Sequence, residues 1–392
     1  MVQSPVAPWP SYSEEEIEAV AAVLRSGKVN YWTGQECRMF EREFAAFAGT
    51  DKAIALTNGT VALDLALKAL GIGPGDEVVV TPRTFIASVS SVINAGATPV
   101  FADVEQDSGN ISAATIAPVL SPRTKAVIPV HLGGWPCDMP AILALTNPRG
   151  IAVIEDCAQA HGARISGQSV GSFGVIGAWS FCQDKIITTG GEGGMVTTSD
   201  DALWDAMWSF KDHGKSWSAV YEREHSPGYR WLHESFGTNW RMLEMQAVIG
   251  RIQLRRLADC SARRGAIAMR YAAALAPFSS TIRMPLPGPK MTHAWYRCYA
   301  YVRPEGLKPG WDRDRIVAEV TALGVPLFHG TCSEVYREKA FEGTGLAPPQ
   351  RLPMAAELGE TSLMFLTHPT LSDGDVERIC AAVTAVLELA CR

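Results

Sequence analysis

The chain has 392 residues, of which 47% are hydrophobic and 19% are charged. This length leaves room for two domains around a large core, and the composition excludes a disordered or fibrous protein. The formal net charge is −6 and no run of basic residues occurs, so we expect neither nucleic acid nor a membrane as a partner.

The N-terminus lacks a basic start followed by an apolar stretch, and no later segment approaches the roughly 18 apolar residues of a membrane span. Nine scattered cysteines occur, never with the spacing C-x-x-C, which favours a reducing compartment and no structural zinc. We therefore expect a cytoplasmic protein without a metal site.

The first predicted helix begins at a capping box of Ser13 and Glu16 and ends at Gly27, inside an N-terminal helical arm over residues 1–50.

Residues 52–200 alternate short β-branched runs with amphipathic stretches. The predicted strands lie within residues 52–59, 77–84, 98–104, 124–134, 151–159, 175–182 and 193–200. Several runs are continuously apolar, and the early ones are separated by segments long enough for a helix. This pattern favours the α/β class, with a mostly parallel sheet covered by helices on both faces. Ligands of such sheets bind where the strands end, so the residues after each run are candidate site residues.

The last third of the chain is predicted to form a smaller α+β domain. Residues 242–275 indicate one long helix or two abutting ones, and the Pro- and Gly-rich residues 283–290 indicate a hinge. A strand over 293–302 and helices over 312–324 and 372–390 follow, the last capped by Ser372 or Asp373. We therefore predict a large domain over residues 1–275 and a small domain over 276–392.

Two strand ends carry polar residues that suit a bound cofactor. Asn58, Gly59 and Thr60 stand between a strand and a helix, where free N–H groups and the helix dipole suit a phosphate. The alternative is a plain turn at Asn58-Gly59 with Thr60 as the helix cap. Asp156 follows an apolar strand, and a buried carboxylate needs a cation or several donors. A protonated heterocyclic nitrogen would satisfy it, whereas the alternative is that Asp156 caps the following turn.

A lysine follows the next apolar strand. Lys185 lies between Trp179-Ser180-Phe181 and a glycine-rich run over residues 190–194, so it is not placed like a solvated surface lysine. A desolvated amine of this kind is suited to imine formation. The glycines would let the backbone approach a cofactor closely, or else form an ordinary hairpin turn. Asn239 stands in a polar loop before the long helix, and its surroundings alone indicate nothing further.

The motifs NGT, RTF, EDCAQ, SFCQDK, GGEGG, GTNWRM and MQAVIGRIQL follow one another in this order. From about residue 8 to 385 the sequence resembles the DegT/StrS family of nucleotide-sugar aminotransferases. These belong to the fold type I, or aspartate aminotransferase, superfamily of enzymes that use pyridoxal 5′-phosphate (PLP). The resemblance implies that Lys185 binds PLP as a Schiff base and later shuttles a proton. It also implies that Asp156 pairs with the pyridine nitrogen, that Gln159 contacts the phenolic oxygen or the ring, and that Phe85 stacks on the ring.

The resemblance further implies a phosphate site shared between two subunits. Gly59, Thr60 and Ser180 would bind the phosphate, and Asn239 would reach it from a neighbouring subunit. The active site would then be complete only in a homodimer. Relatives with histidine in place of this lysine behave as sugar dehydratases, so Lys185 favours transamination.

The implied reaction moves an amine from L-glutamate to a keto-sugar nucleotide. The expected acceptor is a 4-keto-6-deoxy hexose on UDP or dTDP, made for bacterial surface polysaccharide or related amino sugars. The alternatives are a cyclitol ketone, another substrate without a nucleotide, or a PLP-binding regulator without turnover.

Four residues are candidate substrate contacts. Tyr31 and Trp32 stand where relatives have a loop near the sugar, with plain packing as the alternative. His293 and His329 lie in the predicted small domain, where the segment around His329 departs from the pattern of many relatives and leaves the sugar and nucleotide open.

Overall fold

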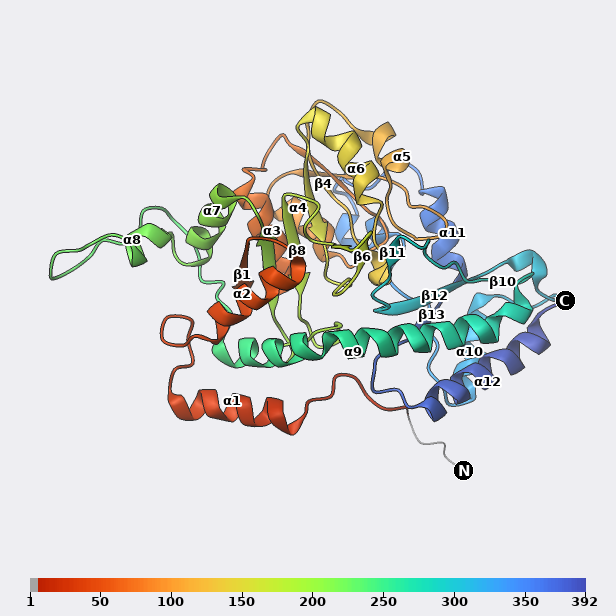
Figure 1. The fold of residues 1–392 in the computed structure, drawn as a ribbon. Helices are drawn as coiled ribbons and strands as arrows, with labels where there is room; N and C mark the ends of the chain where they lie inside the picture. The colour runs from red at the N-terminus through yellow and green to blue at the C-terminus, as the bar shows by residue number, and fades with distance from the viewer. Residues whose placement is uncertain (1–5) are drawn as a thin grey trace.

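A seven-stranded sheet forms the centre of the computed structural model, which describes residues 6–392 (Figure 1). Its strands lie in the order β1-β9-β8-β5-β4-β2-β3. Their bounds are β1 Lys52–Leu56, β2 Glu77–Val80, β3 Thr98–Phe101, β4 Thr124–Ile128, β5 Ala152–Asp156, β8 Ile176–Ser180 and β9 Gly194–Thr198. All seven lie inside the segments predicted from the sequence, which confirms those strands.

The sheet is mostly parallel, as predicted for the α/β class. β2 pairs in parallel with β3 and β4, β4 pairs in parallel with β5, and β5 pairs in parallel with β8. β9 is antiparallel to both of its neighbours, β8 and β1. The chain returns from β8 to β9 through residues 181–193 without a crossover helix, and a parallel pairing would need such a crossover.

The strands are apolar throughout because both faces of the sheet are buried. Val78 and Val80 of β2 pack into one hydrophobic core, whereas Val79 between them packs into another. Helices α3 (Gly59–Ala69) and α4 (Ala87–Asn94) contribute to the first core, and α5 (Ala113–Ile116) and α6 (Met139–Thr146) contribute to the second. Alternate side chains of one strand thus reach opposite layers of helices.

The long helix predicted over residues 242–275 is α9 (Glu244–Leu275), a single helix. It packs against α1 (Glu14–Ser26) and α2 (Glu36–Ala48), and its far end packs against α12 (Asp373–Ala390). Figure 1 shows it running from beside the large sheet to the small one. The capping box of Ser13 and Glu16 at the start of α1 is confirmed.

A smaller antiparallel sheet contains β10 (Ile282–Arg283), β12 (Arg297–Val302) and β13 (Ser362–Leu366), in the order β10-β12-β13. Helices α10 (Arg313–Ala322) and α12 share its hydrophobic core. Ser372 caps α12, so the first of the two predicted cap residues is the cap. All three strands come from residues 276–392, the predicted small domain, although the domain boundary itself stays a prediction.

The predicted hinge over residues 283–290 does not lead straight into the small sheet. It joins β10 to β11 (Met291–Thr292), which pairs with β6 (Arg164–Ile165). β6 also pairs with β7 (Gln168–Ser169), which completes a three-stranded sheet. The chain therefore pairs with β6, which belongs to the predicted large domain, before β12 begins.

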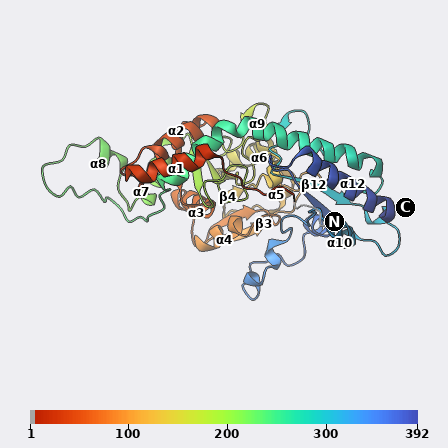
Figure 2. The ribbon, with the colours of Figure 1, turned by 90° about the horizontal axis from the view of Figure 1, so that it is seen from below.

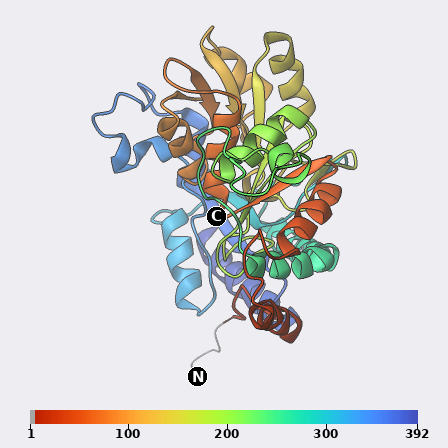
Figure 3. The same ribbon diagram turned by 90° about the vertical axis from the view of Figure 1, so that its left-hand side faces the viewer.

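Two segments extend from this framework. The first is α8 (Trp217–Tyr221) with residues 222–237, which project from the body near α7 (Asp201–Lys211) (Figures 1 and 2). The second is residues 330–352, which precede α11 (Pro353–Thr361) and pack through Tyr336 and Phe341 on Phe101 of β3 (Figure 3).

Short 3-10 helices occur at Ala117–Val119, Leu132–Gly134, Asn147–Arg149, Ala276–Phe278, Pro304–Gly306, Val335–Arg337 and Lys339–Phe341. Within residues 6–392, no helix has the length and apolar character that a bilayer crossing requires.

Candidate active site

Asp156 ends β5 at the edge of the sheet where the parallel strands terminate. Its carboxylate is buried, with 5% of the residue exposed. Oδ2 accepts a hydrogen bond from Ser88 Oγ (2.8 Å), and Oδ1 accepts one from the Ala158 amide (3.1 Å). Burial raises the pKa of Asp156, and these two donors together with the charge of Lys185 act in the opposite direction. The turn-capping alternative therefore explains the contact of Oδ1 with the Ala158 amide, whereas Oδ2 is oriented by Ser88.

Lys185 follows β8, the neighbour of β5, and its side chain is 15% exposed. Its Nζ lies 3.8 Å from Asp184 Oδ1 and 5.1 Å from the ring centre of Tyr296. Although burial acts to raise the pKa of Asp184, the charge of Lys185 and a hydrogen bond from the Tyr296 hydroxyl hold it below the usual value. The backbone is fixed as well, since the Trp9 indole donates to the Lys185 carbonyl (3.0 Å). The structure thus places a mostly buried amine near the Asp156 carboxylate.

The predicted phosphate site lies where α3 meets the end of β8. Asn58, not Thr60, caps the helix, because its Oδ1 accepts from the Val61 amide (3.0 Å). A Cβ on Gly59 would fall 2.6 Å from Ser180 Cβ, so the two residues are in direct contact. The first amides of a helix have no acceptor inside it. Gly59, Thr60 and Ser180 are therefore together at one helix N-terminus, which is a suitable cradle for a phosphate.

The glycine-rich run packs against this cradle. A Cβ on Gly194 would lie 2.2 Å from the carbonyl oxygen of Asn58, and a Cβ on Gly193 would lie 2.0 Å from Thr189 Oγ1. These glycines therefore let protein segments approach each other closely. The expected close approach of their backbone to a cofactor stays a prediction.

Gln159 and Phe85 are the other two residues that the family resemblance implies as contacts of the PLP ring. Gln159 is buried, and its Oε1 accepts from the Gly133 amide (2.7 Å), which leaves its NH2 group as the donor for a phenolic oxygen. Phe85 is 66% exposed in the loop between β2 and α4, so its ring is available for stacking. Its neighbour Thr84 contacts Ser88 (2.8 Å between hydroxyl oxygens), the donor to Asp156. The residues around Asp156 and Lys185 thus fit PLP by their chemistry: a buried carboxylate, an amine and a helix N-terminus.

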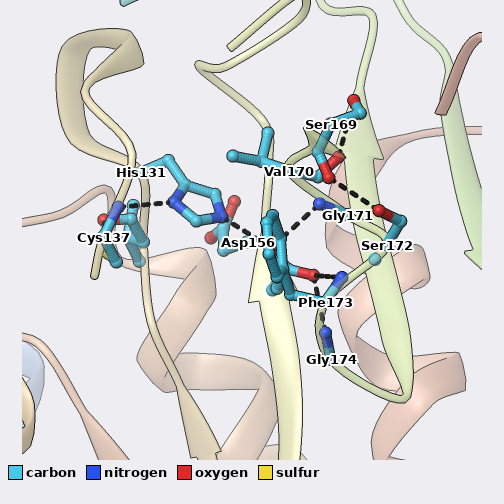
Figure 4. A network of polar contacts seen from close by, with 12 residues as sticks. His131, Cys137, Asp156, Ser169, Val170, Gly171, Ser172, Phe173 and Gly174 are labelled. Atoms are coloured by element: carbon cyan, nitrogen blue, oxygen red, sulfur yellow. Dashed lines mark hydrogen bonds and ion pairs between the residues drawn. The ribbon is translucent and has the colours of Figure 1, made fainter. Parts of the chain in front are cut away.

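The second carboxylate of the EDC motif lies in a separate, saturated network. Glu155 Oε1 accepts from the amides of Phe173 (2.7 Å) and Gly174 (2.8 Å), and Oε2 accepts from the Gly171 amide (2.9 Å) and His131 Nε2 (3.1 Å). Figure 4 shows these contacts beside the end of β5. Successive strand residues point to opposite faces, so only one of the two acids is available to the site.

This network also contains the group that most resembles a metal site. Ligand atoms of His131, Glu155 and Cys157 lie within 4.8 Å of one another. However, His131 Nδ1 accepts from the Cys137 amide (3.0 Å) while Nε2 contacts Glu155, so both ring nitrogens are engaged by protein groups. The network holds the strand end in place, and the expected lack of a metal site stays a prediction.

Three residues of the site were missed by the sequence analysis. They are Ser88, Tyr296 and Trp9, which come from α4, from the start of the small sheet and from the N-terminal segment. Ser88 stands four residues after Thr84, but α4 begins at Ala87, so Thr84 lies outside the helix and helical spacing does not signal their contact. Nothing in the sequence connects Tyr296 or Trp9 with Lys185.

Tyr31, one of the candidate substrate contacts, is completely buried. Its hydroxyl donates to Glu41 Oε2 (3.2 Å) and accepts from the Trp208 indole (3.2 Å). Trp32 is partly buried beside Tyr221, and Lys215 Nζ lies 4.3 Å from its ring. These contacts fit the packing alternative, and the substrate roles of Tyr31 and Trp32 stay predictions.

The two candidate histidines lie in different environments. His293 stacks on Trp295 at 3.9 Å and accepts from its amide (2.7 Å), and burial lowers the pKa of His293 to about 3. His329 is exposed and lies 3.2 Å from Asp314. Asn239 is exposed on the strand-like segment opposite Asp212, so it is accessible to another subunit. None of these placements tests a substrate or phosphate contact.

Comparison with known proteins gives a match over almost the whole chain. Residues 10–384 match the DegT/DnrJ/EryC1/StrS aminotransferase family. The chain is 38% identical over 352 residues to GDP-perosamine synthase of Caulobacter vibrioides, which covers 89% of both proteins. It is 36% identical over 366 residues to dTDP-3-amino-3,4,6-trideoxy-alpha-D-glucose transaminase of Streptomyces venezuelae, covering 93% of this chain and 90% of the relative.

A solved structure is more similar still. The aminotransferase from Psychrobacter cryohalolentis is 58% identical, with a TM-score of 0.97 over 98% of this chain and 99% of that one. The order of strands, the small antiparallel sheet and the long helix are therefore those of an experimentally known aminotransferase.

Proposed function

The chain belongs to the DegT/DnrJ/EryC1/StrS aminotransferase family, and from this premise we propose that it transfers an amine from L-glutamate to a nucleotide-activated keto-sugar. It is a PLP-dependent aminotransferase of the fold type I architecture. The observation that carries the proposal is that the buried Asp156 at the end of β5 feels the charge of Lys185, which follows the neighbouring strand β8. These two residues would supply the acid and the amine that a bound PLP needs.

Each residue of the site has a defined task in this proposal. PLP, when bound, supplies a ring that delocalises the negative charge left when a proton departs from the amine-bearing carbon. Asp156, oriented by Ser88, would keep the ring nitrogen protonated, and Gln159 would donate to the phenolic oxygen. Phe85 would cover one face of the ring and exclude water. Lys185 Nζ would take and return the proton at the reacting carbon, which requires hydrogen-bond reach.

The phosphate would be held by Gly59, Thr60 and Ser180, with Asn239 arriving from a second subunit. Support for such a homodimer comes from the segment over residues 222–237, where Tyr229, Trp231 and Phe236 are 76%, 81% and 99% exposed. Large aromatic side chains that project together into solvent are typical of surfaces that another chain covers. A dimer would bury them and bring Asn239 to the partner's phosphate site.

The proposed acceptor is a 4-keto-6-deoxy hexose on UDP or dTDP, used for bacterial surface polysaccharide or a related amino sugar. Three relatives are named for nucleotide sugars, one on GDP, one on dTDP and one on UDP, so the sugar-nucleotide class is better supported than any one nucleotide. We place the enzyme in the cytoplasm, because all nine cysteines are free thiols, as is usual in a reducing compartment.

The first test addresses Lys185. Borohydride reduction of the PLP-loaded protein, followed by peptide mapping, is expected to find the pyridoxyl group on Lys185. Lys185→Ala is expected to lose the absorption of the bound cofactor, and Lys339→Ala, which removes an exposed lysine, is expected to keep it. A label on another lysine would contradict the assignment.

The second test addresses the substrate. L-Glutamate is added first, and loss of the cofactor band reports the first half of the reaction. The 4-keto-6-deoxy hexoses on UDP, dTDP and GDP, and a cyclitol ketone, are then offered in turn, with mass spectrometry of the products. Formation of an amino sugar nucleotide supports the proposal, and amination of the cyclitol alone contradicts it.

A further inference from the structure

Three basic side chains surround one buried carboxylate at the end of α7, outside the set of cofactor residues. Asp212 is completely buried, and its Oδ1 accepts a hydrogen bond from Arg241 Nη1 (2.7 Å). The same oxygen lies 3.6 Å from Lys215 Nζ, and Oδ2 lies 3.9 Å from Lys211 Nζ. Removing the acid would leave these cations without this counter-charge, which is strongly unfavourable for buried groups. Asp212 therefore holds together the segments that carry the three cations.

Lys211 is the most deeply buried of the three cations. Its side chain has no exposed surface, and Nζ lies 3.6 Å from the ring centre of Tyr31 and 5.0 Å from that of Trp208. Within residues 6–392, Nζ has no hydrogen-bond acceptor. Burial lowers the pKa of Lys211 to about 8, and the charges of Glu41 and Asp212 act in the opposite direction. A side chain without exposed surface cannot meet a ligand, so its effect is on the segments packed around it.

One of these segments carries Asn239. Asp212 and Asn239 face each other in an antiparallel bridge. The backbone hydrogen bonds on the two sides of the bridge join the His213 amide to the Thr238 carbonyl (2.9 Å) and the Trp240 amide to the Lys211 carbonyl (3.1 Å). Arg241, the donor to Asp212, stands two residues after Asn239, so an ion pair reinforces the backbone pairing. Asn239 is thus an exposed side chain on a backbone that is anchored in the interior.

The same segment is joined to the end of β1, next to the proposed phosphate cradle. The Trp240 carbonyl accepts from the Thr57 amide (3.0 Å), and Arg241 forms a bridge with Leu56, the last residue of β1. Thr57 stands directly before Asn58, the cap of α3. A second subunit that meets this edge would bring its own Asn239 to the cradle and receive this one in return, because a two-fold interface uses the same surface on both subunits.

We propose that Asp212, through its ion pairs with Arg241 and Lys211, positions Asn239 for the cofactor phosphate of the partner subunit. The inference rests on the proposed function, which assigns Asn239 to that shared phosphate site. A hydrogen bond to a phosphate is strong only when the donor is aimed at it, so a shift of the anchored backbone weakens the contact. Asp212 is therefore a positioning residue, and its replacement should affect the cofactor site of the partner and not that of its own subunit.

The test measures PLP binding to mixed dimers. Two subunits with different affinity tags are produced together, one with Asp212→Asn and the other with Lys185→Ala, and two successive affinity steps isolate the dimers that contain both. The absorption of lysine-bound PLP counts only the sites that contain Lys185. In the mixed dimer this site lies in the Asp212→Asn subunit, and its partner supplies an undisturbed Asn239.

We expect the Asp212→Asn homodimer to bind PLP about tenfold or more weakly than wild type, because a charge-assisted hydrogen bond is lost at both sites. The mixed dimer should instead have one site with wild-type affinity. A merely structural role of Asp212 would damage the subunit that carries the substitution, so mixing would restore nothing.

Three controls accompany this variant. Asn239→Ala should give the same weakening and the same restoration when mixed with Lys185→Ala. Gly59→Ala should be weakened but not restored, because Gly59 belongs to the cradle of its own subunit. Asp205→Asn, which changes an exposed carboxylate on α7, should bind PLP like wild type. If Asp212→Asn does not fold, Arg241→Gln takes its place, since it removes one ion pair and leaves Asp212 with two lysines.

The proposal is overturned if the Asp212→Asn homodimer, or the Arg241→Gln homodimer in its place, binds PLP as tightly as wild type. It is also overturned if the single Lys185 site of the mixed dimer stays weak while Asn239→Ala is restored by mixing. Failure of the shared site in the proposed function is a different result: the protein would be monomeric, or Asn239→Ala would keep full affinity or gain nothing from mixing, and the inference would then fall with it.

Discussion

Replacing Glu155 with glutamine should destabilise the fold without removing any atom of the active site. Glu155 is completely buried and accepts four hydrogen bonds. A glutamine keeps the shape but has one acceptor oxygen, which can still serve Phe173 and Gly174. Its NH2 group would then meet two donors, the Gly171 amide and His131 Nε2. His131 cannot change tautomer to help, because its Nδ1 accepts from the Cys137 amide.

The magnitude follows from the two lost bonds. Each hydrogen bond to a buried charged acceptor contributes about 1.5–3 kcal/mol, so Glu155→Gln should lower the free energy of unfolding by about 3–6 kcal/mol. This is a large share of the roughly 5–15 kcal/mol by which proteins are stable. The β5 end would also loosen, since the His131 amide donates to the Asp156 carbonyl (3.2 Å). PLP affinity should therefore fall as well.

Urea unfolding followed by circular dichroism measures the first effect, and cofactor titration measures the second. Glu342→Gln is the matched control, because Glu342 is exposed and its replacement should change stability by no more than about 0.5 kcal/mol. If Glu155→Gln lowers stability by less than about 1 kcal/mol, the four-donor network does not hold the strand end and the reasoning is wrong.

Three further predictions concern the phosphate cradle and the buried histidines. Asn58→Ala should lower the free energy of unfolding by about 1 kcal/mol through loss of a helix cap, whereas Asn58→Asp should keep the cap and the stability. Urea unfolding that shows the same loss of stability for both variants would contradict this. Gly59→Ala places a methyl group 2.6 Å from Ser180 Cβ, so PLP affinity should fall at least about tenfold. An unchanged PLP affinity in a titration would contradict the assignment of Gly59 to the phosphate site. Burial lowers the pKa of His161 and of His293 to about 3 from 6.5, so the unfolded chain binds more protons and stability should fall as pH drops from about 6.5 towards 3. His161→Phe should make that fall shallower, and identical urea midpoints for the variant and wild type across this range would show that His161 is not neutral in the fold.

The sequence by itself determined the α/β class and the seven strands of the large sheet, and it predicted the two candidate cofactor residues, Asp156 and Lys185. The physical reason is local: short apolar runs mark the strands, Asp156 ends one of them and Lys185 follows another by five residues, and parallel strands end at one edge of the sheet. The ordered motifs then indicated the family by their resemblance to it.

Only the tertiary structure decided which polar groups act together across distant segments. Asp156 is oriented by Ser88 of α4, Asp184 is held by Tyr296 of the small-sheet segment, and Tyr31 is buried against Trp208. Such pairs are separated by 68 to 177 residues, so no local pattern signals them. The buried ion pairs of Asp212 are likewise visible only once their surroundings are known, because burial is a property of packing, not of sequence.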